Sequence, residues 1–127
     1  MHADERRLNS VSEMIIGCAY RVANEMGVGF LEKVYENAMF VELTQAGTKV
    51  VQQFPIVVRY RGFVVGDYYA DLLVDDYVLV ELKHAEGFDD MHIAQCQNYL
   101  KATGLKLCLL INFGKSKIEI KRLVNNL

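Results

Sequence analysis

Three charged side chains lie in stretches of the sequence that otherwise resemble buried strands, and together they could bind a metal ion and a phosphate. Residues 68–83 read YYADLLVDDYVLVELK, a segment rich in valine, leucine and tyrosine, as in strands buried on both faces. Charged side chains such as Asp71, Glu81 and Lys83 occur in such strands when they are paired or bind something. We therefore take these three residues as candidates for a site.

Strand geometry decides whether these side chains can meet. Side chains alternate along a strand, so Glu81 and Lys83 point the same way, about 6.6 Å apart. A two-residue turn before the second strand would set Ala70 opposite Glu81 and send Asp71 to the other face. The two carboxylates therefore come together only if the turn has three residues or one strand bulges.

The carboxylates and the lysine suit one particular reaction. Carboxylate oxygens favour Mg²⁺ or Mn²⁺ over zinc, and these hard cations leave coordination positions for a substrate phosphate. Such a set is typical of metal-assisted phosphodiester hydrolysis. The same residues also allow a purely structural interpretation, in which Asp71 and Lys83 form an ion pair between strands and Glu81 lies at a solvated end of the sheet.

Two further motifs place polar side chains on helices. In Gly29-x-x-Glu32-x-x-Tyr35, the glycine allows a tight turn into a helix, and the spacing sets Glu32 and Tyr35 on adjoining positions. In Gln95-x-x-x-Tyr99, an amide and a phenol one turn apart could hydrogen-bond a lysine or a phosphate. Each motif has a structural alternative, because carboxylates are favoured near helix starts and amide–phenol pairs occur on helix surfaces by chance.

A zinc site is a weaker interpretation of other residues. It would need His84, His92, Cys96 and Cys108. Only His92 and Cys96 lie one helical turn apart, and zinc sites are usually built from two such closely spaced pairs. The sequence therefore favours oxygen ligands over a zinc set.

Basic residues gather toward the C-terminus although the chain has a formal net charge of −2. Residues 101–127 contain six lysines and arginines and one glutamate, a net charge of +5, which leaves −7 for the first hundred residues. A strip that could hold a nucleic-acid backbone is made of Arg59, Arg61, Lys115, Lys117 and Lys121. The lysines around position 119 equally suit the solvated face of an edge strand.

The elements that must position these residues follow from changes in hydrophobic period. Helical spacing predicts helices over residues 10–26, 31–47 and 89–102. Alternation and enrichment in valine, tyrosine, isoleucine and phenylalanine predict strands over residues 50–60, 63–74, 77–83, 106–112 and 117–124. The order ααβββαββ, without repeat or linker, indicates an α/β fold that borders on α+β, with a mixed sheet flanked by helices.

Local signals predict how these elements begin and pack. Ser10, followed by Glu13, predicts a capping box at the start of the first helix. Pro55 predicts an edge strand or a bulge. The second helix is expected to pack through an apolar side that contains Leu31, Val34, Ala38 and Val41.

The composition is that of one globular domain. The chain has 127 residues, of which 52% are hydrophobic and 24% charged, and this excludes a disordered or collagenous chain. No stretch approaches the roughly 20 apolar residues of a membrane span, and the first residues lack the order of a secretory signal. Cys18, Cys96 and Cys108 are odd in number and far apart, which argues against disulfides. We expect a single domain over residues 1–127 and a cytoplasmic location.

Taken in order, the motifs resemble those of one protein family. The chain is similar to the GxxExxY family of small bacterial and archaeal proteins, which looks like a branch of the PD-(D/E)XK nuclease superfamily. The resemblance covers about residues 14–124. It rests on Gly29-Phe-Leu-Glu32-Lys-Val-Tyr35, Ala70-Asp71, Val80-Glu81-Leu82-Lys83, Gln95-x-x-x-Tyr99 and the runs 98–105 and 110–114. It implies a restriction-endonuclease-like core. The chain departs from the superfamily pattern at Ala70, which stands where the name has proline.

The resemblance also implies roles for the strand residues. Asp71 and Glu81 would bind Mg²⁺ or Mn²⁺, and the Leu82 carbonyl could add a ligand. Lys83 would orient the attacking water and stabilise the charge that develops on the phosphate. We prefer this role to that of a general base, because two nearby carboxylates favour the charged form of a lysine.

The helical residues complete the implied site. Glu32 would assist from the first helical layer, while Gln95 and Tyr99 would support the lysine or contact nucleic acid. We therefore expect a metal-dependent nuclease, with DNA as the nucleic acid and no membrane partner. A core that cuts both strands of a duplex would act as a homodimer. The alternative is a non-catalytic module with a nuclease-like fold, which binds nucleic acid or acts as an accessory, partner-binding protein.

Overall fold

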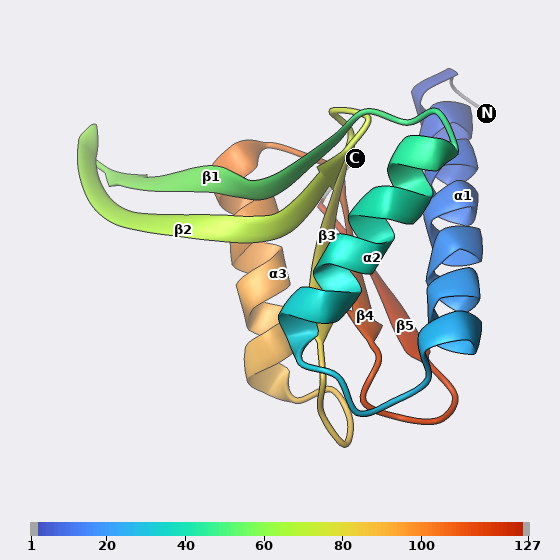
Figure 1. Cartoon of the computed structure of the whole chain (residues 1–127). Coiled ribbons are helices and arrows are strands. Elements are labelled where there is room, and N and C mark those ends of the chain that lie inside the picture. Colours follow the sequence, from blue (N-terminus) through green and yellow to red (C-terminus); the bar gives the residue numbers. More distant parts are fainter. Residues whose placement is uncertain (1–2, 126–127) are drawn as a thin grey trace.

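The computed structural model describes residues 3–125 as a five-stranded mixed sheet with helices on both faces (Figure 1). Helices α1 and α2 pack on one face and α3 packs on the other. The α/β fold bordering on α+β and the order ααβββαββ are thereby confirmed. The elements are α1 (Ala3–Met26), α2 (Glu32–Gln45), β1 (Val50–Tyr60), β2 (Phe63–Val74), β3 (Val78–Lys83), α3 (Asp90–Thr103), β4 (Leu107–Asn112) and β5 (Glu119–Val124).

The two central strands form the best-buried part of the sheet. β3 and β4 pair in parallel and are joined through α3. Their sequences, VLVELK and LCLLIN, are almost entirely buried. Parallel strands covered on both faces need such continuous apolar runs. β3 therefore holds Glu81 and Lys83 on a strand that packing keeps rigid.

β1 and β2 form a long hairpin that leaves the body of the sheet. Of the residues of β2, Leu72–Val74 at its end pair with β3, whereas β1 follows β2 along nearly its whole length. Residues 54–70, which we call the hairpin arm, project away from the rest of the molecule (Figure 1). β1 is an edge strand, as Pro55 predicts, and its pairing shifts between Val58 and Arg59.

The turn between β2 and β3 meets the geometric condition for a joint site. It spans three residues, 75–77, because Val74 pairs with Val78. Continuing this register sets Asp71 opposite Glu81, and not Ala70. The turn length alone therefore decides that the two carboxylates meet.

The first helix begins earlier than the sequence predicts. α1 starts at Ala3, so Ser10 lies inside the helix and the expected capping box with Glu13 is wrong. Two tertiary contacts explain the extra turns, because Leu8 is buried in the core and Arg7 forms an ion pair with Asp75 at 3.2 Å. Within residues 3–125, none of the helices has both the length and the apolar character that crossing a membrane requires.

The second helix packs through a different face from the one predicted. Leu31 is 80% exposed and Val41 is 51% exposed, so the expected apolar side is wrong at these two positions, although Ala38 packs against the core. The buried residues of α2 are Tyr35, Glu36, Met39 and Leu43. The hydrophobic pattern misses this face because one of its members is a carboxylate, which hydrogen bonds from a neighbouring strand make compatible with burial.

Candidate active site

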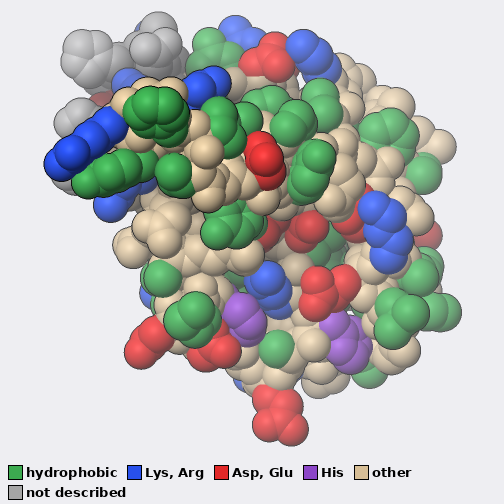
Figure 2. All heavy atoms as spheres, turned by 90° about the vertical axis from the view of Figure 1, so that its left-hand side faces the viewer, with side chains coloured by type: hydrophobic (Ala, Val, Ile, Leu, Met, Phe, Trp, Pro, Cys, Tyr) green, Lys and Arg blue, Asp and Glu red, His purple; other side chains and the backbone are tan. Residues whose placement is uncertain are grey.

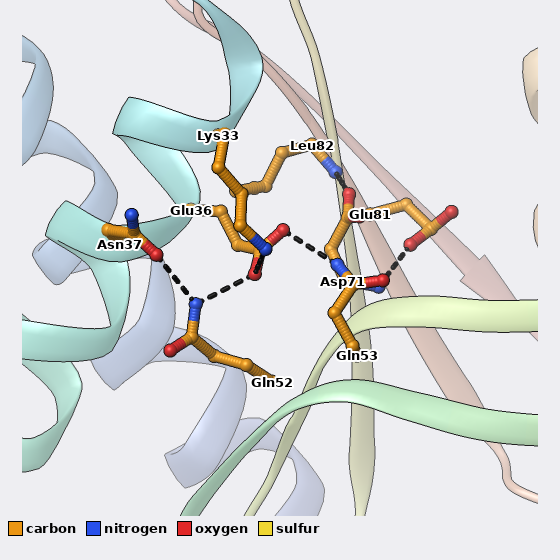
Figure 3. Close-up of polar contacts among 8 residues, drawn as sticks. All are labelled: Lys33, Glu36, Asn37, Gln52, Gln53, Asp71, Glu81 and Leu82. Atoms are coloured by element: carbon orange, nitrogen blue, oxygen red, sulfur yellow. Dashed lines mark hydrogen bonds and ion pairs between the residues drawn. The ribbon is translucent and has the colours of Figure 1, made fainter.

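Asp71 is linked to β3 by two hydrogen bonds, one with Glu81 and one with Leu82 (Figure 3). The Asp71 backbone N–H donates to Glu81 Oε2 at 2.7 Å, and the Leu82 backbone N–H donates to Asp71 Oδ2, also at 2.7 Å. The last backbone pair between these strands is Leu72 with Val80. The carboxylates thus satisfy backbone donors at the point where β2 leaves β3 to form the hairpin arm. Both side chains are positioned by the strands themselves.

Burial makes the negative charges of this pair costly. Glu81 is 3% exposed, and burial together with the charge of Asp71 raises its pKa to about 9. Burial also raises the pKa of Asp71, and the charges of Glu36 and Glu32 act in the same direction. Two close carboxylates in a desolvated place favour a bound cation or a bound proton.

Lys83 lies two residues after Glu81 and is held by α3. Its Nζ donates to Gln95 Oε1 at 3.2 Å. The structural alternative, an ion pair between Lys83 and Asp71, is not among the ion pairs formed by residues 3–125. The amide on α3 therefore reaches the lysine, as the spacing of the Gln95 motif allowed.

The start and end of α3 fix the position of Gln95. Asp89 caps the helix by accepting from the His92 backbone N–H at 2.9 Å, and His92 Nδ1 accepts from the Asp89 backbone N–H at 3.3 Å. At the other end, Gly104 adopts φ +74°, the left-handed conformation that favours glycine. These caps keep the helix, and with it the amide, in register with β3.

Tyr99 lies one turn after Gln95 on the same helix and is 5% exposed. Burial, Glu81 and Asp71 raise the pKa of its phenol to about 12. The group therefore stays protonated at neutral pH and can donate a hydrogen bond. Its ring also meets the ring of Tyr68 on the hairpin arm, with centroids 5.8 Å apart.

Glu36 is a buried carboxylate that the sequence interpretation missed. It accepts from Lys33 Nζ at 3.0 Å, from Gln52 Nε2 at 2.7 Å and from Gln53 Nε2 at 2.8 Å (Figure 3). Glu32, the predicted residue, is exposed at the first position of α2. The signal for Glu36 was its place one helical turn after Glu32, on the side of the helix that also faces Asp71.

Gly29 and Tyr35 of the Gly29-x-x-Glu32-x-x-Tyr35 motif fix the backbone conformation between α1 and α2. Gly29 adopts φ +113° in the loop between α1 and α2, a conformation that side chains disfavour. The Tyr35 hydroxyl donates to the Gly27 carbonyl at 2.6 Å, and its ring stacks on Phe113 at 4.7 Å. These contacts set where α2 begins and so where Glu32 and the turn after it lie.

Asn112 is a second buried polar residue without a sequence prediction. It is 0% exposed. Its Oδ1 accepts from the backbone N–H groups of Ala85 and Gly114, and its Nδ2 donates to the Ala85 carbonyl. A β-carbon on Gly114 would lie 2.5 Å from the Ala85 backbone, so glycine is needed there. Together they hold the chain that follows Lys83.

The zinc set and the single basic strip are both wrong. His92 caps α3, while Cys96 and Cys108 are buried in the core on the α3 face. No group of three histidine, cysteine or acidic residues in the described part of the chain could hold a metal ion. The strip is divided because Arg59 lies on β1 and Lys121 on β5, at opposite edges of the sheet.

A mixed sheet flanked by helices, with an acidic pair and a lysine on adjoining strands, defines the restriction-endonuclease-like class of nuclease folds. The family model of the PD-(D/E)XK nuclease superfamily matches residues 9–123. The chain therefore belongs to this superfamily, whose nucleases generally use divalent metal ions.

Two solved structures resemble this fold. One is an alkaline exonuclease (LHK-Exo) from Laribacter hongkongensis, with 16% identity, a TM-score of 0.49 and coverage of 91% of this chain and 82% of that chain. The other is LHK-Exo in complex with dAMP, with 16% identity, a TM-score of 0.50 and coverage of 85% and 76%. A search of curated proteins finds no match. At this identity the likeness concerns the fold alone.

Proposed function

We propose that this chain is a Mg²⁺- or Mn²⁺-dependent nuclease that hydrolyses phosphodiester bonds of nucleic acid, with DNA as the expected substrate. One observation carries the proposal: Asp71 and Glu81 meet across adjoining strands, and Lys83 follows on the second of them. Membership of the PD-(D/E)XK nuclease superfamily supports it.

The donor set fits a hard divalent cation. Asp71 and Glu81 are neighbouring carboxylates whose burial and mutual repulsion a cation would relieve. Since the described residues contain no third histidine, cysteine or acidic ligand for a cluster, the Leu82 carbonyl, water and a substrate phosphate would supply the other oxygens, as Mg²⁺ prefers. When bound, such a cation supplies positive charge to the reacting phosphate.

The chain's own residues would position the reactants. Lys83 carries three N–H donors and no acceptor, so one can remain on Gln95 while others orient water and stabilise negative charge on the phosphate. Tyr99 keeps its proton and would donate a hydrogen bond to the nucleic acid from the neighbouring turn of α3. Glu32, exposed at the start of α2, would act through water at the rim of the site.

We also infer that the chain belongs to the GxxExxY branch. The backbone conformation of Gly29 and the contacts of Tyr35 explain why glycine and tyrosine occupy these two motif positions. A cytoplasmic homodimer is part of the same proposal.

The test is a cleavage panel with single- and double-stranded DNA and RNA, in Mg²⁺, Mn²⁺ or chelator. Wild-type protein should cut in the presence of metal, and Lys83→Ala should lose at least about 100-fold in rate. Lys121→Ala, an exposed lysine on β5, is the matched control and should cut like the wild type.

The panel also separates the nuclease from the alternative function. If cleavage does not depend on metal and is identical for wild-type protein and Lys83→Ala, a nuclease built on this site is excluded. Salt-sensitive binding of nucleic acid without cleavage, unchanged by Asp71→Ala and Lys83→Ala, would instead indicate a non-catalytic binding module.

A further inference from the structure

A groove of about 660 Å³ lies between the hairpin arm and α3. The arm contributes Val57, Arg59 and Tyr68 to its lining, and α3 contributes Gln95, Tyr99 and Lys101. Figure 2, which looks toward the free end of the arm, shows hydrophobic and Lys or Arg side chains gathered over the upper half of this face. The groove is therefore apolar and aromatic with cations at its sides.

The groove borders the candidate active site, because two of its lining residues, Gln95 and Tyr99, also lie beside the lysine and the carboxylates. Gln95 lines it and also accepts the hydrogen bond from Lys83. Tyr99 lines it and lies close enough to Glu81 and Asp71 for their charges to raise its pKa. A molecule seated in the groove would thus lie next to the two helical residues that border the carboxylate pair and the lysine.

Among the residues that the structure describes, the two cations of the groove have no acidic partner. Arg59 and Lys101 are exposed, and neither forms an ion pair within residues 3–125. The Arg59 guanidinium donates a hydrogen bond to the Gly62 carbonyl, at 3.5 Å. Both charges are therefore available to phosphate groups, which bind by displacing counterions.

The Tyr68 ring is half-exposed at the wall of the groove. Gly66, two residues earlier on the same face, leaves room for it, since a β-carbon there would lie 3.3 Å from the ring. Exposed aromatic faces bind the faces of unpaired bases. A duplex offers phosphates and base edges, not base faces, so this wall suits a single strand.

We propose that the groove binds an unpaired strand of nucleic acid, with a base stacked on Tyr68 and phosphates at Arg59 and Lys101, and leads it to the carboxylate pair. This inference rests on the proposed function and specifies its substrate as single-stranded. The strand would run between the hairpin arm and α3.

Binding can be measured apart from cleavage by fluorescence anisotropy in chelator, with a labelled single strand of about 12 nucleotides and its blunt duplex. Wild-type protein should bind the single strand at least tenfold more tightly than the duplex. Tyr68→Ala should weaken this binding about tenfold, because stacking contributes roughly 1–3 kcal/mol per base. Tyr68→Phe, which keeps the ring, should bind like the wild type.

Tyr69→Ala is the matched control for the ring. Tyr69 is 57% exposed and does not line the groove, since neighbouring side chains of a strand point to opposite faces. It should leave binding unchanged. Equal losses in Tyr68→Ala and Tyr69→Ala would overturn the proposed groove.

The cations can be tested through salt dependence. Arg59→Ala and Lys101→Ala should each reduce the slope of log affinity against log salt by about 0.7, the value for one phosphate contact on a single strand. Lys121→Ala on the far edge of the sheet should leave the slope unchanged. Unchanged slopes in all three variants would place the phosphates elsewhere and overturn the assignment.

The outcomes distinguish this inference from the proposed function. If wild-type protein cuts nucleic acid with metal but binds duplex as tightly as single strand, the nuclease stands and the single-strand groove is wrong. If it neither cuts nor binds any nucleic acid, both are wrong.

Discussion

Two buried glutamates of this protein have opposite surroundings. Glu36 is 4% exposed and accepts from a lysine and two glutamine amides, whereas Glu81 is 3% exposed and accepts one backbone N–H within residues 3–125. Glu81 also faces Asp71, another carboxylate. The contrast separates a carboxylate that side-chain donors already satisfy from one whose negative charge a bound cation could balance. Full partnering is expected of a structural group, and incomplete partnering of a site.

The largest effect is expected from removing a carboxylate of the proposed metal site. Asp71→Asn keeps an oxygen for the Leu82 N–H but removes a charge from the carboxylate pair. We expect the metal-dependent cleavage rate to fall at least about 100-fold and the rise in melting temperature on adding Mg²⁺ to disappear. Cleavage assays and thermal melts with and without Mg²⁺ measure both. Wild-type rates in this variant would remove Asp71 from the site.

The next largest effect is expected at Glu36, the carboxylate whose role we take to be structural. Glu36→Gln places an NH₂ group where the Gln52 and Gln53 amides donate, so at least one of these part-buried hydrogen bonds is lost. The free energy of unfolding should fall by about 2 kcal/mol, as measured by urea denaturation, while the Mg²⁺-induced rise in melting temperature stays as in the wild type. Unchanged stability would mean that the cluster does not anchor α2 to β1.

The same substitution at Glu81 should act in the opposite direction. Because the pKa of Glu81 is about 9 in the folded chain and ordinarily 4.5, the native state holds this proton over a range where the unfolded chain has released it. The stability of the metal-free protein should therefore fall as pH rises from about 4.5 to about 9. Glu81→Gln keeps an acceptor for the Asp71 N–H and lacks this fall.

Thermal melts in chelator at pH 5 and pH 8 measure the difference. At pH 8, the free energy of unfolding of Glu81→Gln should exceed that of the wild type by about 1 kcal/mol or more, which is a few degrees in melting temperature. The difference should be smaller at pH 5. A gap that is the same at both pH values would contradict the raised pKa. Adding Mg²⁺ at pH 8 should stabilise the wild type and not this variant.

The smallest effect comes from the exposed end of the Glu36 cluster. Lys33 is 59% exposed in its ion pair with Glu36, and solvent screens such pairs. Lys33→Ala should change the free energy of unfolding by less than about 1 kcal/mol in urea denaturation. A loss as large as that of Glu36→Gln would show that the lysine, and not the glutamines, satisfies the buried carboxylate.

Strands were predicted more accurately than helices. The bounds of β1 and β2 match the prediction at both ends, because their valines and aromatic residues stop at turn residues such as the Arg61-Gly62 pair, where both φ angles are positive. The helices were misjudged where tertiary contacts overrode local signals. Because Leu8 packs in the core, α1 begins earlier than predicted. Because hydrogen bonds satisfy Glu36, the buried face of α2 differs from the predicted one.

The sequence alone determined the candidate residues and the order of the elements. Asp71, Glu81 and Lys83 stand out because charge is rare in apolar strands, and hydrophobic period and turn residues mark where elements start and stop. These signals are local, so they are present in the unfolded chain. The Gln95 spacing likewise allowed for the contact that α3 makes with Lys83.

The tertiary structure alone decided whether those residues form a site. A turn of three residues, and not two, puts Asp71 opposite Glu81, and side-chain period cannot specify turn length. The partnering of Glu36 and the groove beside Tyr68 depend on contacts between segments far apart in sequence. Such contacts exist only after packing has brought α2, α3 and the hairpin arm together, because burial and charge depend on the whole neighbourhood of a residue.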